Sequence, residues 1–187
     1  MIYFIAILIQ IVFLGLDRLT KWFAVNNLKG QSGIEIIEGV FRLSYRENTG
    51  AAFSILSGTR WFFVIFTSVV LIAMIVLFIK FPKDRPHFWL RISMSVIFAG
   101  AVGNFIDRVI SGYVVDMFYF YWFEFPVFNV ADMCVVCGAI ALFIIYFFFI
   151  EDKSAKKAKK GIKEETKQEK EEKEEEKIEE ETGLGNE

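Results

Sequence analysis

Residues 61–79 read WFFVIFTSVVLIAMIVLFI, and only Thr67 and Ser68 interrupt this apolar run. A helix needs about 20 apolar residues to cross the hydrocarbon core of a bilayer. The bilayer offers no water to a free backbone group, so a segment that crosses it here must be helical. The run therefore predicts a membrane-spanning helix over 61–79.

Three further stretches, over residues 2–23, 88–110 and 127–150, have the length and apolar character of spanning helices. The whole chain is 55% hydrophobic and 17% aromatic, and a soluble domain of this length could not cover so much apolar surface. The first stretch lacks the basic start and cleavage site of a secretory signal, so we expect it to stay as a helix. Residues 1–150 are therefore expected to form one four-helix membrane domain.

Residues 151–187 form a different kind of segment. They hold 10 Lys against 14 Asp or Glu, whereas residues 1–150 hold 11 Lys or Arg against 9 Asp or Glu. We expect this tail to be disordered or to form a solvated helix, because it has too few apolar residues for a core. Neither part has the one-signed charge of a nucleic-acid binder, so we expect no nucleic-acid partner.

The loop over residues 24–60 has its own pattern. Residues 34–45 contain strand-forming residues in partial alternation, broken by Gly39. This predicts a small sheet on the outer membrane surface. The expected fold class is thus an all-α membrane protein, with four transmembrane helices and a small extracytoplasmic β-sheet in the first outer loop.

Lysine and arginine positions orient the helices. The loop over 80–87 holds three basic residues and residues 153–160 hold five, whereas residues 118–126 hold none. The loop over 24–60 also contains basic residues, which glutamates offset in part. The balance predicts that both termini are cytoplasmic.

This topology gathers polar residues near the outer surface. A carboxylate within a span costs roughly 2.5–3.5 kcal/mol, so these residues should face one another rather than lipid. Within each helix they are spaced by three or four residues and share one face. The residues that we expect to line a polar pocket are Asp17, Lys21, Asn104, Asp107, Arg108, Asn129 and Asp132.

Asp116 and Asp132 are the candidate catalytic pair. Asp132 lies inside an apolar run and is hard to explain by structure alone. Asp116 by itself fits a structural role, as a loop residue or a helix N-cap, as well as a functional one. Two neighbouring carboxyls can share one proton, so that one acts as base and the other as acid. The pair therefore predicts a reaction centre.

Other polar residues have structural interpretations. Asp17 with Lys21, and Asp107 with Arg108, are expected to be ion pairs where helices leave the membrane. Cys134 and Cys137 lie in an apolar helix, which favours packing over redox chemistry.

Histidine and metal chemistry find no support in the sequence. His87 is the only histidine and lies in the loop over 80–87, which excludes a histidine triad. No residues have metal-ligand spacing, so we expect neither metal nor cofactor. A Ser–Lys pair between Lys21 and Ser44, Ser54 or Ser57 is an open alternative.

Five short motifs occur in order along residues 1–150. They are DRLTK (17–21), NTGAAF (48–53), GNFIDR (103–108), GYVVDM (112–117) and FNVAD (128–132). In order and content they resemble the motifs of the bacterial lipoprotein signal peptidase family, also called signal peptidase II. The charged tail is not part of that pattern.

The resemblance implies a four-helix aspartyl endopeptidase of the bacterial inner membrane, with its active site at the outer leaflet. Such an enzyme removes signal peptides from diacylglyceryl-modified prolipoproteins and cuts before the lipidated cysteine. It implies Asp116 and Asp132 as the catalytic pair. The implied binding or supporting residues are Asn48, Gly50, Asn104, Asp107, Arg108, Asn129, Asp17 and Lys21. We expect lipid as a further partner and a monomeric protein.

Two other classes of protein fit the same features. A proton-coupled transporter also uses intramembrane carboxylates, but these are expected near the midplane rather than at one face. A membrane scaffold would use the tail and the loop over 24–60 for partners and would need no aspartate pair.

Overall fold

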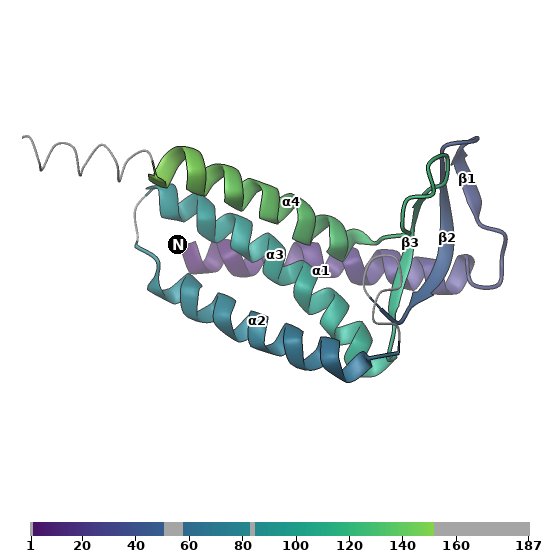
Figure 1. The fold of residues 1–187 in the computed structure, drawn as a ribbon, viewed down its shortest axis with the longest axis horizontal. Coiled ribbons are helices and arrows are strands. Elements are labelled where there is room, and N and C mark those ends of the chain that lie inside the picture. The colour runs from purple at the N-terminus through teal and green to yellow at the C-terminus, as the bar shows by residue number, and fades with distance from the viewer. Residues whose placement is uncertain (1, 51–57, 83–84, 152–187) are drawn as a thin grey trace, which may run out of the picture. The chain divides into compact units, whose positions relative to one another are not determined.

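The structure is a computed structural model that describes residues 2–50, 58–82 and 85–151. Its helices are α1 (Ile2–Asn27), α2 (Arg60–Lys80), α3 (Arg85–Ile110) and α4 (Val130–Ile145), followed by a π-helix over Tyr146–Glu151. Within the described residues, four segments are long and apolar enough to cross a membrane (Figure 1). The prediction of a four-helix membrane protein is therefore confirmed.

The chain divides into two compact units, Met1–Phe143 and Ile144–Glu187. The first unit contains the helices and the sheet discussed below. Of the second unit, the structure describes the end of α4 and the π-helix, where Phe147 and Phe148 are exposed. The expected disorder or solvated helix of the tail falls on residues outside the described ranges.

Two helix ends differ from the sequence expectation. The first helix was expected to end at about Phe23, but α1 continues to Asn27. The fourth was expected to begin at about Val127, but α4 begins at Val130. Before α4, Phe128 instead pairs with Phe118 in an extended segment.

A three-stranded antiparallel sheet lies at one end of the helices. Its strands are β1 (Ile34–Ile37), β2 (Phe41–Asn48) and β3 (Val114–Phe120), in the order β1-β2-β3. The loop over residues 24–60 supplies β1 and β2 as predicted. The third strand was not predicted, because it follows α3 rather than lying in that loop.

The turn from α3 into β3 depends on Gly112. Its φ of +85° lies in the left-handed region that favours glycine. The amides of Ser111 and Gly112 both bond to the carbonyl of Asp107, which closes the helix end. The chain then enters β3, whose valine and aromatic residues suit a strand.

The sheet packs against the C-terminal end of α1 and the residue that follows it. Ala24 and Leu28 at that end are buried together with Val115 and Met117 of β3. Val115 and Met117 alternate with Asp116 along the strand, so they point to the opposite face. This apolar contact fixes β3, and with it Asp116, relative to α1.

Small residues allow the helices of the first unit to approach closely. A Cβ atom at Gly100 of α3 would collide with the carbonyl oxygen of Ala131 in α4. A Cβ atom at Gly103 would lie 2.6 Å from Asp17 Oδ2. Glycine at these positions therefore brings α1 and α4 onto α3 at the level of the polar residues.

We predict that Gly100→Ala destabilises the protein. The added methyl group meets backbone rather than a flexible side chain, and overpacking of this kind costs about 1–3 kcal/mol. Thermal unfolding in detergent measures the effect. Gly15→Ala is the matched control, because nothing lies within 4 Å of a Cβ at that position of α1. Equal midpoints for the two variants would contradict the prediction.

Candidate active site

Asp116 lies near the start of β3 and is only 1% exposed. Its Oδ1 accepts a hydrogen bond from Asn129 Nδ2 at 2.6 Å, and its Oδ2 accepts one from Asn48 Nδ2 at 2.9 Å. The strand register explains the second contact. Asn48 pairs with Val114, two residues before Asp116 and on the same face of the sheet.

Asp132 lies in the first turn of α4, and the start of that helix holds its carboxylate. Asp132 Oδ2 accepts a hydrogen bond from the amide of Asn129 at 3.1 Å, and Asn129 Oδ1 accepts one from the amide of Asp132 at 2.9 Å. This reciprocal pattern is a capping box. It places the carboxylate at the helix N-terminus, where the helix dipole favours negative charge.

Asn129 therefore contacts both carboxyl groups. Its side-chain amide donates to Asp116, and its backbone amide donates to Asp132. The residue is completely buried. One side chain at a helix start thus holds the strand aspartate and the helix aspartate next to each other.

Asn104 on α3 supports the pair from the other side. Its Nδ2 donates to Asp132 Oδ1 at 2.7 Å. Its Oδ1 accepts hydrogen bonds from Lys21 Nζ at 2.9 Å and from Asn129 Nδ2 at 3.2 Å. The ammonium group of Lys21 can only donate, so it fixes which end of the Asn104 amide faces Asp132.

Lys21 belongs to a four-residue ion network between α1 and α3. Its Nζ lies 3.0 Å from Asp17 and 2.8 Å from Asp107, and Arg18 lies 2.9 Å and 2.7 Å from the same two carboxylates. Two positive charges therefore balance two negative charges. Asp17 also accepts a hydrogen bond from the amide of Ala131 at 3.1 Å, which ties the network to α4.

Arg108 carries a further positive charge at the site. Its Nη2 donates to the carbonyl of Gly50 at 3.0 Å, and its guanidinium lies 4.7 Å from the centre of the Phe63 ring. The amide of Gly50 in turn donates to Asn48 Oδ1 at 3.0 Å. Arg108 is thus connected through Gly50 to the residue that holds Asp116.

Burial, and after it the nearby charge of Asp132, raise the pKa of the Asp116 carboxyl to about 7. The amides of Asn48 and Asn129 act in the opposite direction, because they stabilise the ionised form. At neutral pH a large fraction of Asp116 is therefore protonated.

A cavity of about 600 Å³ opens beside the pair. Asp132, Asn104 and Arg108 line its polar end. The remaining lining is mostly apolar and comes from α2, α3, α4 and the segment before α4. It includes Phe66, Val70, Ile97, Ala101, Phe125, Phe128, Met133 and Val136.

The structure joins all ten residues proposed from sequence into one chain of polar contacts. The path runs through Arg108, Gly50, Asn48, Asp116, Asn129, Asp132, Asn104, Lys21, Asp17 and Asp107. Asp107 pairs with Arg18 and Lys21 rather than with its neighbour Arg108, which corrects the expected pairing.

Three features of the site were missed from sequence. Arg18 was not proposed as a site residue although it bonds to Asp17, Asp107 and the carbonyl of Gly103. The sequence favoured a loop or an N-cap as the structural setting of Asp116, whereas the residue lies in strand β3. The Asn-x-x-Asp spacing over 129–132 is a capping signal that could have located the start of α4.

The Ser–Lys alternative gains no support from Ser44. Its buried hydroxyl has no hydrogen-bond partner, and Lys21 bonds instead to two carboxylates and an amide oxygen. Ser54 and Ser57 lie outside the described residues.

Two solved structures resemble this chain closely. One, described as "Bacterial membrane enzyme structure by the in meso method at 2.3 A resolution", has a TM-score of 0.70 and 36% identity. The match covers 81% of this chain and 90% of that one. A second structure of a bacterial membrane enzyme has a TM-score of 0.68 and 36% identity over 77% of this chain and 93% of its own. The fold is thus that of a multi-pass bacterial membrane enzyme.

Sequence comparison defines the family. Residues 9–149 match the family described as Signal peptidase (SPase) II. A lipoprotein signal peptidase of Symbiobacterium thermophilum is 44% identical over 75% of this chain and 92% of its own length. The corresponding proteins of Enterococcus faecalis and Clostridioides difficile are 41% and 44% identical, over 80% and 79% of this chain and 90% and 97% of theirs. The chain belongs to the signal peptidase II family, as its motifs predicted.

We predict that Lys21→Met strongly destabilises the protein. The change leaves Asp17 and Asp107 short of a positive partner in a buried position, and breaking such a pair costs about 3–5 kcal/mol. Lys29→Met is the matched control, because the Lys29–Glu47 pair is solvent-exposed and surface pairs add little to stability. Thermal unfolding of both variants in detergent measures the difference. Similar losses of stability would contradict a structural role for the network.

Proposed function

We propose that this protein removes signal peptides from diacylglyceryl-modified bacterial prolipoproteins, with Asp116 and Asp132 as its catalytic pair. The observation that carries the proposal is the bridge made by Asn129, which bonds to both carboxyl groups at the polar end of an apolar cavity. The relatives named lipoprotein signal peptidase support the substrate class. The cut would fall before the lipidated cysteine.

The two aspartates divide the acid and base roles. Asp116 exposes less surface than Asp132, and the raised pKa of Asp116 lets it hold a proton at neutral pH. Asp132 lies at a helix N-terminus, which favours a negative charge, and it lines the cavity. Asp132 is therefore the base that accepts a proton from the attacking water, and Asp116 is the acid that donates a proton to the scissile carbonyl oxygen.

The next step returns the protons. Water adds to the carbonyl carbon, and the tetrahedral intermediate is neutral because one carboxyl has lost a proton and the other has gained one. Asp132, now protonated, donates to the amide nitrogen as the carbon–nitrogen bond breaks. Asp116, now ionised, takes a proton from one of the two hydroxyl groups of the intermediate, and that oxygen becomes the carbonyl oxygen of the new carboxylic acid. Both residues thereby regain their starting states.

The cavity suits a substrate that is part polar and part lipid. Its polar end offers the amide of Asn104 and the guanidinium of Arg108 to a peptide backbone. Its apolar remainder lies among spanning helices, where hydrocarbon and hydrophobic side chains are the natural occupants. An acylated peptide could place its cleavable bond at the aspartates without leaving the bilayer.

The distribution of basic residues supports an orientation. Residues 80–87 and the tail are basic-rich, so both termini are assigned to the cytoplasm. The sheet and the aspartate pair would then lie at the outer leaflet of the bacterial inner membrane.

The pair is tested by Asp116→Asn and Asp132→Asn. Asparagine keeps the size of the side chain but cannot exchange protons, so each change should lower cleavage by about 10³-fold or more. The double variant should be no worse than either single variant, because the two residues act as a unit. The measurement is processing of a lipidated precursor by each variant at matched membrane levels.

Glu47→Gln is the control for these variants. Glu47 is an exposed carboxylate next to Asn48 on β2 and should tolerate the change.

Substrate capture should survive in the two aspartate variants, since the cavity keeps its shape. Residual cleavage above a few per cent in either variant would remove that aspartate from the proposed role.

The pH dependence of cleavage tests the assignment of Asp116 as acid. Its protonated form is the active one, so cleavage should fall as pH rises through its pKa of about 7. Asn48→Ala removes a donor that lowers this pKa, and the fall should therefore move to higher pH. Glu47→Gln should leave the profile in place. A fall that stays in place or moves to lower pH in Asn48→Ala would contradict the assignment.

A further inference from the structure

The turn between β3 and α4 exposes large aromatic side chains. Trp122 is 67% exposed, and Phe123 and Phe125 are 49% and 43% exposed. Residues 118–126 contain no Lys or Arg, and Glu124 is their only charged residue. Exposed apolar groups that cluster in this way mark a surface that is covered by something other than water.

The turn is held in shape rather than loose. Phe123 lies 6.2 Å from the Phe120 ring and 5.5 Å from the Phe125 ring, and Phe125 lies 5.8 Å from Phe128. The amide of Phe125 also bonds to the carbonyl of Phe120 at 3.0 Å. The exposed aromatic groups are therefore a fixed feature of the fold.

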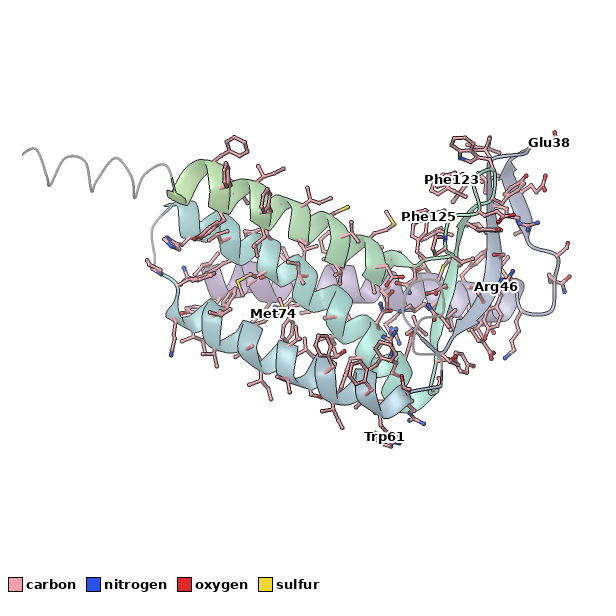
Figure 2. All side chains as sticks on the ribbon, in the orientation of Figure 1. Glu38, Arg46, Trp61, Met74, Phe123 and Phe125 are labelled. Carbon is pink, nitrogen blue, oxygen red and sulfur yellow. The ribbon has the colours of Figure 1, made fainter. Side chains whose placement is uncertain are left out.

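The figures place this turn beside the spanning helices. The strands run across the direction of the helices (Figure 1), so the sheet lies along the plane in which the helices end. Figure 2 shows Phe123 and Phe125 on the side of the sheet toward the helices and Glu38 on the far side. Phe123 and Phe125 thus lie on the helix side of the sheet, and Glu38 lies away from the helices.

Lipid is the occupant that this surface fits best. Phe125 lines the same cavity as Met133 and Val136 of α4, both of which are exposed on a membrane-spanning helix. The aromatic surface is therefore continuous with one that faces lipid. Trp61, 67% exposed at the outer end of α2, shares this end of the molecule (Figure 2). Tryptophan favours the boundary between hydrocarbon and headgroups.

We propose that residues 121–125 insert Trp122 and Phe123 into the bilayer leaflet on the side of the sheet. Residues 121–125 lie close to the aspartate pair along the chain. Phe128 makes two backbone hydrogen bonds with Phe118, and the next residue, Asn129, contacts both carboxyl groups. The turn thereby holds the site at a fixed depth in the membrane. This inference concerns membrane contact and does not depend on the hydrolytic chemistry.

The test measures fluorescence quenching by lipids brominated on their acyl chains. A chain with Trp22→Phe, Trp61→Phe and Trp89→Phe retains Trp122 as its single tryptophan. It is reconstituted in vesicles of phosphatidylcholine and phosphatidylglycerol, with and without the brominated lipid. The matched control carries Trp122→Phe and Glu38→Trp in the same background, which moves the probe to the far side of the sheet.

We expect brominated lipid to quench Trp122 several-fold more strongly than the tryptophan at position 38. A chain that retains only Trp61 reports correct insertion and should also be quenched. A second probe, Phe123→Trp in the Trp122→Phe background, repeats the measurement at the neighbouring position.

Equal quenching at the turn and at position 38 in a correctly inserted chain overturns the proposal. So does the absence of quenching at both turn positions, because water or protein would then cover the turn instead of lipid.

Discussion

A charged side chain inside a membrane needs a partner within the protein, and this constraint organises the ends of the helices next to the sheet. Asp17, Lys21 and Asp107 are almost entirely buried where α1 meets α3. With Arg18 they form a neutral set, and removing one member would leave a charge without compensation. The network therefore holds both helices in one register, and through Lys21 it also orients Asn104 against Asp132.

The aspartate pair is assembled from two different kinds of element. Asp132 is held by the cap of its own helix, which is a local interaction. Asp116 is held by a strand, and its partner Asn48 lies 68 residues away in the sequence. Asn129 joins the two, because its side chain reaches the strand while its backbone begins the helix. The distance between the carboxyl groups is thus set by the packing of the sheet against the helices.

This division explains what the sequence could predict. The spanning helices follow from hydropathy, and the shared face of Asn104 with Asp107 follows from helical periodicity. The strand over 114–120 could not be predicted in this way, because a short apolar run is typical of strands and helices alike. The pairing of this strand with residues 41–48 is also a long-range contact. The pairing of Asp107 with α1 rather than with Arg108 was missed for the same reason, since it depends on how two helices pack.

The position of the pair along the helices meets two opposing requirements of the proposed reaction. Hydrolysis needs water and a carboxylate that can ionise, and both are least favourable at the centre of a bilayer. A lipid-anchored peptide needs a site that hydrocarbon can reach, and withdrawing acyl chains from the bilayer costs about 0.8 kcal/mol for each CH₂ group. The ends of the helices meet both demands. Asp132 lies in the first turn of α4, and the apolar lining of the cavity continues from it to Val136. The physical cost of burying carboxylates and the chemistry that we propose for them therefore favour the same depth.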